Sequence, residues 1–580
     1  MGALLPSGVI ELIQNNLPFL SAISIPVFSY LAFQIFPYIQ PLFSPLRRTN
    51  QHGGSLVAKV LHAHGVQYVF TLVGGHISPI LVAAKSEGIQ VIDVRSEATT
   101  VFAADAVSRL SGTPGVAIVT AGPGVTNTIT AMKNAQMAQS PLVLIGGAAA
   151  TVLKGRGSLQ DVEQIDVLRS IVKYHASIRN VREIVPVLRR AFYESMTGVP
   201  GPVFIEIPID CLYCIGEVSA SMNLGQCLRK KQLKVDSAEY KRVIVPYEYQ
   251  NKANDDFNVD VIAKYLETQT SEQPIYIDLA KKQNPFIVEK YLRYQVRYLF
   301  AGAFNASYNY SPIRPEIIQP RISDINAIIN LLLNAKKPCL VISSQALLQS
   351  QKAEQIRKAV ETLGIPTFLS SMARGLLGRN HKLYIKQGRT AALKQSDLIL
   401  LFGVMVDFRL DYGRVLNSKA KIVAVNRSYT DLKLNTDLFW KPHIKLQCDP
   451  GETLLSMANQ IDTVYKQSYE KVSGNVFEAW CAGLKEKEIA KEAANEKKAA
   501  TPSYPRPALN MKKEIKEVIN PMLLCQQIEK YMDENSIIIV DGGDFAATAA
   551  YICRPRGPLK WLDPGPFGTL GVGAGFALGA

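Results

Sequence analysis

The sequence predicts an α/β protein with parallel, doubly wound sheets in three domains, preceded by an N-terminal single-pass membrane helix. Short, nearly continuous apolar runs alternate with helical runs over most of the chain, which is typical of strands buried in a parallel sheet. Glycine-rich turns follow several of these runs, and a long uncharged segment precedes the first of them. These three observations define the predicted architecture, whose third domain is incomplete.

The composition is that of a large globular protein, with 580 residues of which 47% are hydrophobic and 19% are charged. The net charge of +15 comes from Lys and Arg spread along the chain, which favours a solvated basic surface over an anionic partner. No nucleic-acid-binding signature occurs, so we expect no such partner. The eight cysteines are scattered, with one CxxC at Cys211 and Cys214, and we expect reduced thiols without a metal.

The segment from Leu17 to Ile39 carries no charged residue and is long enough to span a bilayer. Its two prolines, Pro26 and Pro37, are tolerated in membrane helices. The first basic pair, Arg47-Arg48, follows the segment and should hold that side in the cytoplasm. A signal peptide, a targeting presequence and a buried helix are the alternatives, but the first two need a basic start. The sequence therefore predicts a single-pass anchor.

Beyond this segment, polar stretches divide the alternating pattern into blocks. The strands predicted for the first block are "YVFTLVGG", "VIDV", "GVAIVTAG", "PLVLIGGA" and "GPVFIEIPID", those for the second are "PCLVISS", "IPTFLSS", "DLILLFGVMVD" and "KIVAVN", and "SIIIVDGGD" begins a third. The predicted divisions are 1–51 for the anchor and its flank, 52–214 for the first domain, 215–320 for an insertion, 321–465 for a central domain, 466–512 for a linker helix and 513–580 for the incomplete third domain.

Glu97 stands at the start of an Ala-rich apolar helix in "VIDVRSEATTVFAADAVSRLSG". Burial there would penalise its charge, whereas an acidic residue in a first turn is also what helix capping favours. Two glycine turns, Gly122–Gly124 and Gly542-Gly543, each join a strand to a helix, where backbone N–H groups can hold an anion. A tight turn explains each equally well, and neither matches the P-loop pattern. The residues alone leave these interpretations open and indicate no reaction.

Six motifs occur in order along the chain: "RSEATTVFAADAVSRLSG", "TAGPGVTNTITAMKNAQMAQSPLVLIGG", "GSLQDVEQIDVLRSIVKYHASI", "GPVFIEIPID", "MARGLLGR" and "FGTLGVGAGFALGA". Together they resemble thiamine diphosphate (ThDP) enzymes of the acetolactate synthase, oxalyl-CoA decarboxylase and 2-hydroxyacyl-CoA lyase group. The resemblance runs from about residue 52 to the last residue, and the set is far more specific than one glycine turn. It implies a pyrimidine-binding first domain, a Rossmann-like central domain and a diphosphate-binding third domain.

The resemblance makes Glu97 a catalytic residue rather than a helix cap. In the family, the matching glutamate bonds N1′ of the aminopyrimidine and favours the imino tautomer, which removes the proton from C2 of the thiazolium. A buried carboxyl suits this role because desolvation raises its pKa. Gln160, the second implied catalytic residue, matches one that faces the reacting centre, as Gly75 does. Both lie in the first domain, which in this family belongs to the opposite subunit, so we expect a homodimer or homotetramer.

The third domain contributes the other implied cofactor-binding residues. Gly568 matches a residue whose carbonyl receives the 4′-amino group, and Leu570 matches the apolar residue that bends the cofactor. The loop over the diphosphate is matched by Gly543, Asp544 and Phe545.

Three features depart from the family pattern. Leu159 stands where acetolactate synthases usually have Phe, and Asn426 stands where nucleotide-binding relatives often have an acidic residue on the ribose. The family's Mg²⁺ motif, Gly-Asp-Gly with a later Asn, would lie beyond Ala580. The implied cofactors are thus ThDP and Mg²⁺, with the metal ligands expected outside these residues.

The resemblance implies a lyase that cleaves the C1–C2 bond of long-chain 2-hydroxyacyl-CoA, giving formyl-CoA and a fatty aldehyde shortened by one carbon. A lipid substrate suits a membrane-held enzyme, and we expect it at the endoplasmic reticulum membrane with its catalytic domains facing the cytosol. Two alternatives stand beside it: acetolactate synthase-type condensation of 2-oxo acids, and a catalytically inactive scaffold, because the metal motif is missing.

Overall fold

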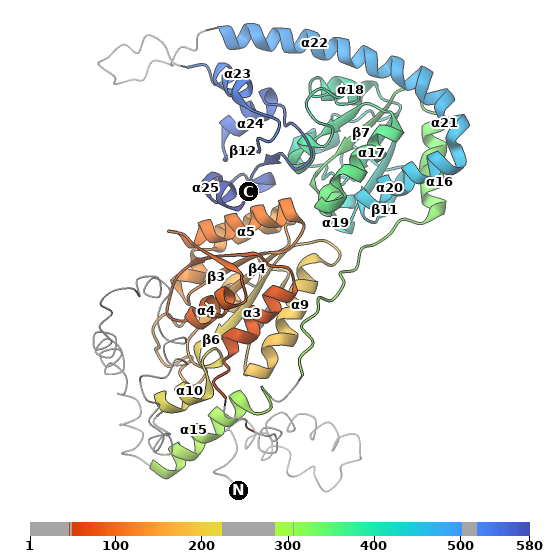
Figure 1. The fold of residues 1–580 in the computed structure, drawn as a ribbon. Coiled ribbons are helices and arrows are strands. Elements are labelled where there is room, and N and C mark those ends of the chain that lie inside the picture. The colour runs from red at the N-terminus through yellow and green to blue at the C-terminus, as the bar shows by residue number, and fades with distance from the viewer. Residues whose placement is uncertain (1–45, 47–48, 223–284, 305–306, 502–518) are drawn as a thin grey trace, which may run out of the picture.

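The computed structural model describes residues 46, 49–222, 285–304, 307–501 and 519–580. Two parallel α/β units follow each other along the chain, and a smaller third unit returns to lie against the first (Figure 1). The prediction of parallel, doubly wound sheets is confirmed.

The first unit is a six-stranded parallel sheet in the order β2-β1-β3-β4-β6-β5. Its strands are β1 (Tyr68–Leu72), β2 (Gln90–Asp93), β3 (Gly115–Val119), β4 (Leu142–Ala148), β5 (Tyr174–Ser177) and β6 (Pro202–Pro208). Its helices are α3 (Gly53–Ala63), α4 (Ser78–Ser86), α5 (Glu97–Ser111), α6 (Pro123–Thr126), α7 (Ile129–Ala138), α8 (Gln164–Leu168), α9 (Ile184–Met196) and α10 (Ile215–Ser221). Helix α15 (Pro285–Phe300) packs against the core of the same unit.

The central strands are apolar throughout because both faces of the sheet are covered. Val116 and Ile118 of β3 belong to the core under α3, α4 and α9, whereas Ala117 and Val119 belong to the core under α5 and α7. Successive side chains of a strand point to opposite faces, so a strand between two helical layers needs apolar residues at every position.

The central unit is a five-stranded parallel sheet in the order β11-β10-β9-β7-β8. Its strands are β7 (Pro338–Ile342), β8 (Thr367–Leu369), β9 (Leu398–Phe402), β10 (Lys421–Asn426) and β11 (Ile444–Gln447). Its helices are α16 (Ile322–Leu333), α17 (Ala353–Leu363), α18 (Arg389–Gln395), α19 (Tyr429–Lys433) and α20 (Pro450–Gln460). They enclose one core of their own.

The long helix α22 (Glu478–Ala500), which follows α21 (Lys466–Val472), leads from the central unit to the third one (Figure 1). The third unit has two paired parallel strands, β12 (Ile538–Ile539) and β13 (Trp561–Leu562), and three helices, α23 (Pro521–Tyr531), α24 (Asp544–Ile552) and α25 (Val572–Gly579). Helix α25 packs along α5 of the first unit, where Phe576 is fully buried against Phe102.

The structure corrects the predicted membrane architecture. Within the described ranges, no helix combines the length and the apolar character that crossing a membrane requires. The 23-residue α22 is long enough, but Lys and Glu recur along it. The predicted span from Leu17 to Ile39 lies outside the described residues. The single-pass helix, and the endoplasmic reticulum membrane location that depended on it, are therefore not supported.

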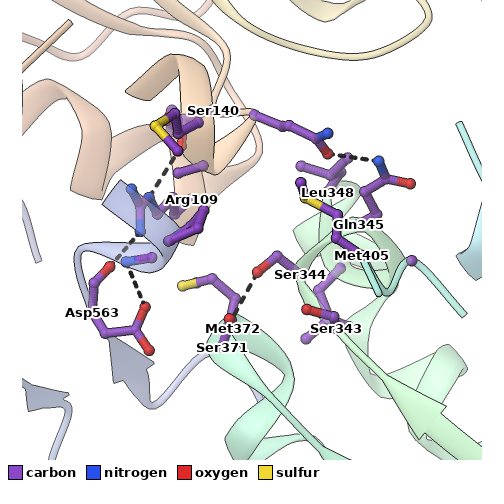
Figure 2. Close-up of a pocket in the computed structure, with 18 of the residues that line it drawn as sticks. Arg109, Ser140, Ser343, Ser344, Gln345, Leu348, Ser371, Met372, Met405 and Asp563 are labelled. Atoms are coloured by element: carbon purple, nitrogen blue, oxygen red, sulfur yellow. Dashed lines mark hydrogen bonds between the residues drawn. The ribbon is translucent and has the colours of Figure 1, made fainter. Parts of the chain in front are cut away.

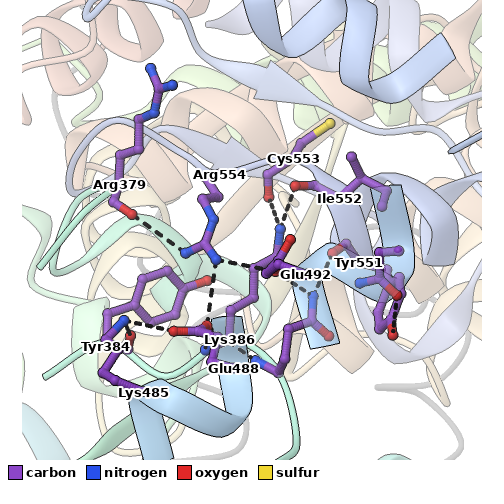
Figure 3. Close-up of polar contacts among 12 residues, drawn as sticks. Arg379, Tyr384, Lys386, Lys485, Glu488, Glu492, Tyr551, Ile552, Cys553 and Arg554 are labelled. Atoms are coloured by element: carbon purple, nitrogen blue, oxygen red, sulfur yellow. Dashed lines mark hydrogen bonds and ion pairs between the residues drawn. The ribbon is translucent and has the colours of Figure 1, made fainter. Parts of the chain in front are cut away.

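A buried polar network joins the central unit, α22 and the third unit (Figure 3). The Lys386 ammonium donates to the carbonyl oxygens of Ile552 and Cys553, at 2.6 and 2.7 Å, where α24 ends. The Lys386 backbone N–H donates to Glu488 of α22 at 2.7 Å, and the Glu488 carboxylate also pairs with Arg554 at 3.4 Å. One lysine therefore bridges three parts of the chain.

Lys386 should make the stability of the protein depend on pH. Burial, and next the neighbouring Arg554, lower the pKa of Lys386 to about 7, whereas an unfolded lysine titrates near ~10.4. The unfolded chain binds the proton more tightly, so this contribution to stability is full above ~10.4 and is lost as the pH falls towards 7. We expect the free energy of unfolding to rise by up to ~1.4 kcal/mol per pH unit between pH ~7 and ~9, relative to Lys386→Met.

Urea unfolding of both proteins at several pH values measures this difference. The matched control is Lys382→Met, because the Lys382 side chain is 76% exposed, and its curve should run parallel to the wild type. Parallel curves for Lys386→Met as well would contradict the prediction.

Candidate active site

Glu97 begins α5 just beyond the carboxyl end of β2. The amide of Asn127 donates a hydrogen bond to Glu97 Oε2 at 3.0 Å. No described residue donates a hydrogen bond to Glu97 Oε1. This oxygen is not among the buried polar atoms that lack a partner, so it is accessible. The side chain is half-buried, which is less burial than the sequence suggested. One carboxylate oxygen is thus held in place while the other stays available.

The Gly122–Gly124 turn faces Glu97 from the end of β3. Gly122 has a φ of +62°, and a Cβ atom there would lie 2.7 Å from the carbonyl oxygen of Gln160, so only glycine fits. A Cβ atom on Gly124 would lie 3.8 Å from Glu97 Oε1. The absence of side chains at this turn therefore keeps open the space beside the carboxylate. The structure brings Glu97 and Gln160 to the same turn.

Gly75 lies at the same edge of the sheet, in the loop after β1. A Cβ atom on Gly75 would meet nothing within 4 Å, whereas one on the preceding Gly74 would lie 2.5 Å from Cβ of Thr120. Thr120 leads directly into the Gly122 turn. Ligands of open α/β sheets bind beyond the carboxyl ends of the strands, and the loops carrying Gly75, Glu97 and Gly122 all occupy that edge.

A buried network beneath the Gly122 turn was missed by sequence reasoning. Gln164 accepts the N–H of Gly122 at 2.8 Å and donates to Glu206 at 2.9 Å. Glu206 is fully buried, and its other oxygen pairs with Lys154 at 2.8 Å. Burial opposes the charge on Lys154, but the bond to Glu206 raises the pKa of its ammonium group. The sequence signal for this network was Glu206, the single charged residue in the otherwise apolar strand "PVFIEIP".

The third unit places its predicted residues on two touching loops. Gly543 and Gly568 both adopt positive φ values, +92° and +65°. A Cβ atom on Gly542 would lie 2.4 Å from the carbonyl oxygen of Thr569, and one on Gly543 would lie 3.6 Å from Leu570 Cδ2. The structure therefore brings Gly543, Gly568 and Leu570 together.

Asp544 is the first residue of α24 and Phe545 the second. Phe545 is 44% exposed and Leu570 is 69% exposed, so both apolar side chains are accessible to a ligand beside the glycine loops. The backbone N–H groups at the start of α24 suit an anion.

Asp541 holds these two loops together and was not predicted as a site residue. Its carboxylate accepts backbone N–H groups of Gly542 at 2.7 Å, Gly571 at 2.8 Å and Gly573 at 3.2 Å. Burial acts to raise the pKa of Asp541, but these N–H donors together lower it below its usual value. The carboxylate thus stays charged and fixes the start of α25.

Helix α25 of the third unit packs closely along α5 of the first unit. A Cβ atom on Gly575 would lie 2.5 Å from Phe102 Cβ, and one on Gly579 would lie 2.1 Å from the carbonyl oxygen of Ala103. Residue numbers rise together along both helices, so they run parallel. The start of α25, which follows Leu570, therefore lies towards the start of α5, where Glu97 is.

The residues present fit ThDP. Glu97 offers a free carboxylate oxygen beside a turn without side chains, and the loop at Gly543 offers N–H groups to a diphosphate. Among the described residues, no three His, Cys, Asp or Glu side chains are grouped closely enough to hold a metal ion, and the seven cysteines in this part of the chain are all free.

A cavity lies where the first, central and third units meet (Figure 2). Arg109, Ser140 and Asp563 line one side, and Gln345 and Met405 line the other. The adjoining cavity, of about 390 Å³, continues to Gly543 and Gly568.

Asn426 is buried, and its amide oxygen accepts at 2.8 Å from Gln345, which lines the Figure 2 cavity. The Asn426 amide nitrogen is buried and has no hydrogen-bond partner among the described residues.

Two parallel units, a free carboxylate at a glycine turn and a second glycine loop at a helix start define a ThDP-type enzyme site. The family description "Thiamine pyrophosphate enzyme, N-terminal TPP binding domain" matches residues 51–167, and "Thiamine pyrophosphate enzyme, central domain" matches residues 325–457.

Among similar proteins, the 2-hydroxyacyl-CoA lyase 2 of Danio rerio is 46% identical over 92% of this chain and 74% of its own. The protein of that name from Homo sapiens is 44% identical over 94% of this chain and 74% of its own. A probable acetolactate synthase of Mycobacterium bovis is 25% identical over 92% and 76%. The chain belongs to the thiamine pyrophosphate enzyme family, in the group of the 2-hydroxyacyl-CoA lyase 2 proteins.

Proposed function

We propose that the protein is a ThDP-dependent carbon–carbon lyase that cleaves the C1–C2 bond of long-chain 2-hydroxyacyl-CoA, giving formyl-CoA and an aldehyde one carbon shorter. The observation that carries this proposal is the identity of 46% and 44%, over more than nine tenths of the chain, with relatives named for 2-hydroxyacyl-CoA cleavage. Leu159, which is 80% exposed beside Gln160, stands where acetolactate synthases usually carry Phe and also favours the lyase.

Bound ThDP supplies a nucleophilic carbon and accepts the electron pair released when C1–C2 breaks. Glu97 would share a proton with the aminopyrimidine through Oε1, while Asn127 fixes the other oxygen. Gln160 and Gly75 would border the substrate.

The third unit would hold the rest of the cofactor. Gly543, Asp544 and Phe545 would lie at the diphosphate, the Gly568 carbonyl would accept the 4′-amino group, and Leu570 would support the bent cofactor. We propose bound Mg²⁺ as well, because a divalent cation neutralises the charge of a diphosphate. The proposal also includes a homodimer or homotetramer, in which the first domain, with Glu97, Gly75 and Gln160, serves the third domain of the opposite subunit.

The test is to incubate the purified full-length protein with ThDP, Mg²⁺ and either 2-hydroxyhexadecanoyl-CoA or pyruvate. We expect formyl-CoA and pentadecanal from the thioester, and no acetolactate from pyruvate. Acetolactate alone would replace the proposal with a synthase. Absence of both products, together with no ThDP binding in titration calorimetry, would replace it with a non-catalytic scaffold.

A further inference from the structure

His76 is a titratable side chain at the candidate site to which no role has been given. It follows Gly75 in the loop after β1, and its ring is half-buried. Nδ1 lies 3.1 Å from the Thr120 hydroxyl, and a Cβ atom on Gly147 would lie 2.5 Å from His76 Cβ. The ring is therefore fixed between the carboxyl ends of β1, β3 and β4.

Thr120 connects this ring to the catalytic carboxylate. A Cβ atom on Gly124 would lie 2.8 Å from Thr120 Cγ2 and 3.8 Å from Glu97 Oε1. Thr120 and Glu97 thus border the same glycine, and His76 contacts Thr120 from the other side. The Thr120 side chain therefore lies between the His76 imidazole and Glu97, at the edge of the sheet where ligands of α/β proteins bind.

The second ring nitrogen is available for chemistry. No residue in the described ranges bonds to Nε2, and it is not among the buried polar atoms that lack a partner, so it faces accessible space. Thr120 occupies Nδ1 and can hold one tautomer, in which Nε2 carries the free lone pair.

The surroundings keep the ring neutral. Burial lowers the pKa of His76 below its usual value. Contacts through Gly124 lead from this ring to Glu97 on α5, and contacts through Gly147 and Gln164 lead to Glu206 of β6 with its partner Lys154. None of these three contributes to the lowered pKa. At neutral pH the imidazole is therefore a base.

We propose that His76 is the acid–base group of the lyase, an inference that rests on the proposed function. The net reaction moves one proton from the 2-hydroxyl oxygen to C1. His76 Nε2 accepts the hydroxyl proton as the C2–O bond becomes the aldehyde carbonyl, C1–C2 breaks, and its electron pair stays with C1. The imidazolium then returns a proton to C1, which becomes the formyl carbon. No other oxidant, reductant or co-reactant is needed.

Neither of the other two candidate residues can do this. Gln160 has no titratable group, and Glu97 is committed to the aminopyrimidine. A base contributes typically ~10²–10⁴-fold to a rate, so its removal should be easy to detect.

The experiment compares His76→Gln with the wild type, using 2-hydroxyhexadecanoyl-CoA. We expect kcat to fall by at least ~100-fold, with KM and the calorimetric affinity for ThDP nearly unchanged. The wild-type kcat should decline below an apparent pKa under ~6.5, because protonation disables the base, and this decline should vanish in the variant. The matched control is His62→Gln, an exposed histidine at the end of α3, which should behave as the wild type.

A second measurement does not depend on the activity of a variant. The chain has seven histidines, so the ¹³C-histidine NMR spectrum is simple enough to follow one ring, assigned by its loss in His76→Gln or His76→Asn. Its pKa should match the kinetic one. A retained rate and pH profile in His76→Gln, or an NMR pKa that differs from the kinetic value, would overturn the inference while lyase activity of the wild type stands. An inactive wild type would instead refute the proposed function.

Discussion

Replacing Glu97 with Gln should lower turnover by roughly 10²–10⁴-fold while the protein stays folded. The carboxylate oxygen Oε1 is free of protein partners in the described chain, and Oε2 is held by Asn127 at 3.0 Å. Glutamine keeps the shape and can keep one hydrogen bond, but it cannot share a proton with the cofactor. The loss should therefore appear in kcat, measured beside a thermal melt.

The competing interpretation, a helix cap, makes a different prediction. If Glu97 only stabilised the start of α5, its replacement would cost about 1 kcal/mol of stability and leave turnover nearly normal. The matched control is Glu354→Gln, since Glu354 also lies in the first turn of a helix, α17, with its side chain 62% exposed. That control should change neither turnover nor ThDP affinity. Near-normal turnover for Glu97→Gln would reject the catalytic role.

Replacing Arg109 with Met should destabilise the protein by about 3–5 kcal/mol, the range for breaking a buried ion pair by removing one partner. Arg109 donates to both carboxylate oxygens of Asp105, at 2.8 and 2.6 Å, and these side chains are 6% and 0% exposed. A third donor, Nη1, reaches the carbonyl oxygen of Asp563 at 2.7 Å, and the guanidinium lies over the Phe576 ring.

Because Asp563 precedes the Gly568 loop, Arg109→Met should also weaken ThDP binding. Urea unfolding and titration calorimetry measure the two effects. The control is Arg169→Met, whose salt bridge to Asp166 is 64% exposed on both sides and should contribute less than ~1 kcal/mol. Equal stability of Arg109→Met and Arg169→Met would show that the buried pair has no net effect on the fold.

The sequence predicted every inner strand of the two large sheets and the edge strands β2 and β8, but it missed the edge strands β5 and β11. β3 and β4 are buried at every residue, so their apolar runs stand out. β5 and β11, both edge strands, have the mixed sequences "YHAS" and "IKLQ". An edge strand packs less completely than a central one, so its residues carry a weaker hydrophobic signal. β13, "WL", is too short for any periodicity.

The sequence alone determined the α/β class, the glycine turns and, through its motifs, the family. Turns at positive φ favour glycine for local steric reasons, so the turns at Gly122 and Gly543 could be recognised from the amino-acid sequence. Only the tertiary structure decided which distant residues meet: Gln164 with Gly122, Arg109 with Asp563, and His76 with Thr120. Each of these contacts joins residues more than forty positions apart. The geometry of a hydrogen bond between such residues depends on how whole sheets and helices pack, which no local pattern records.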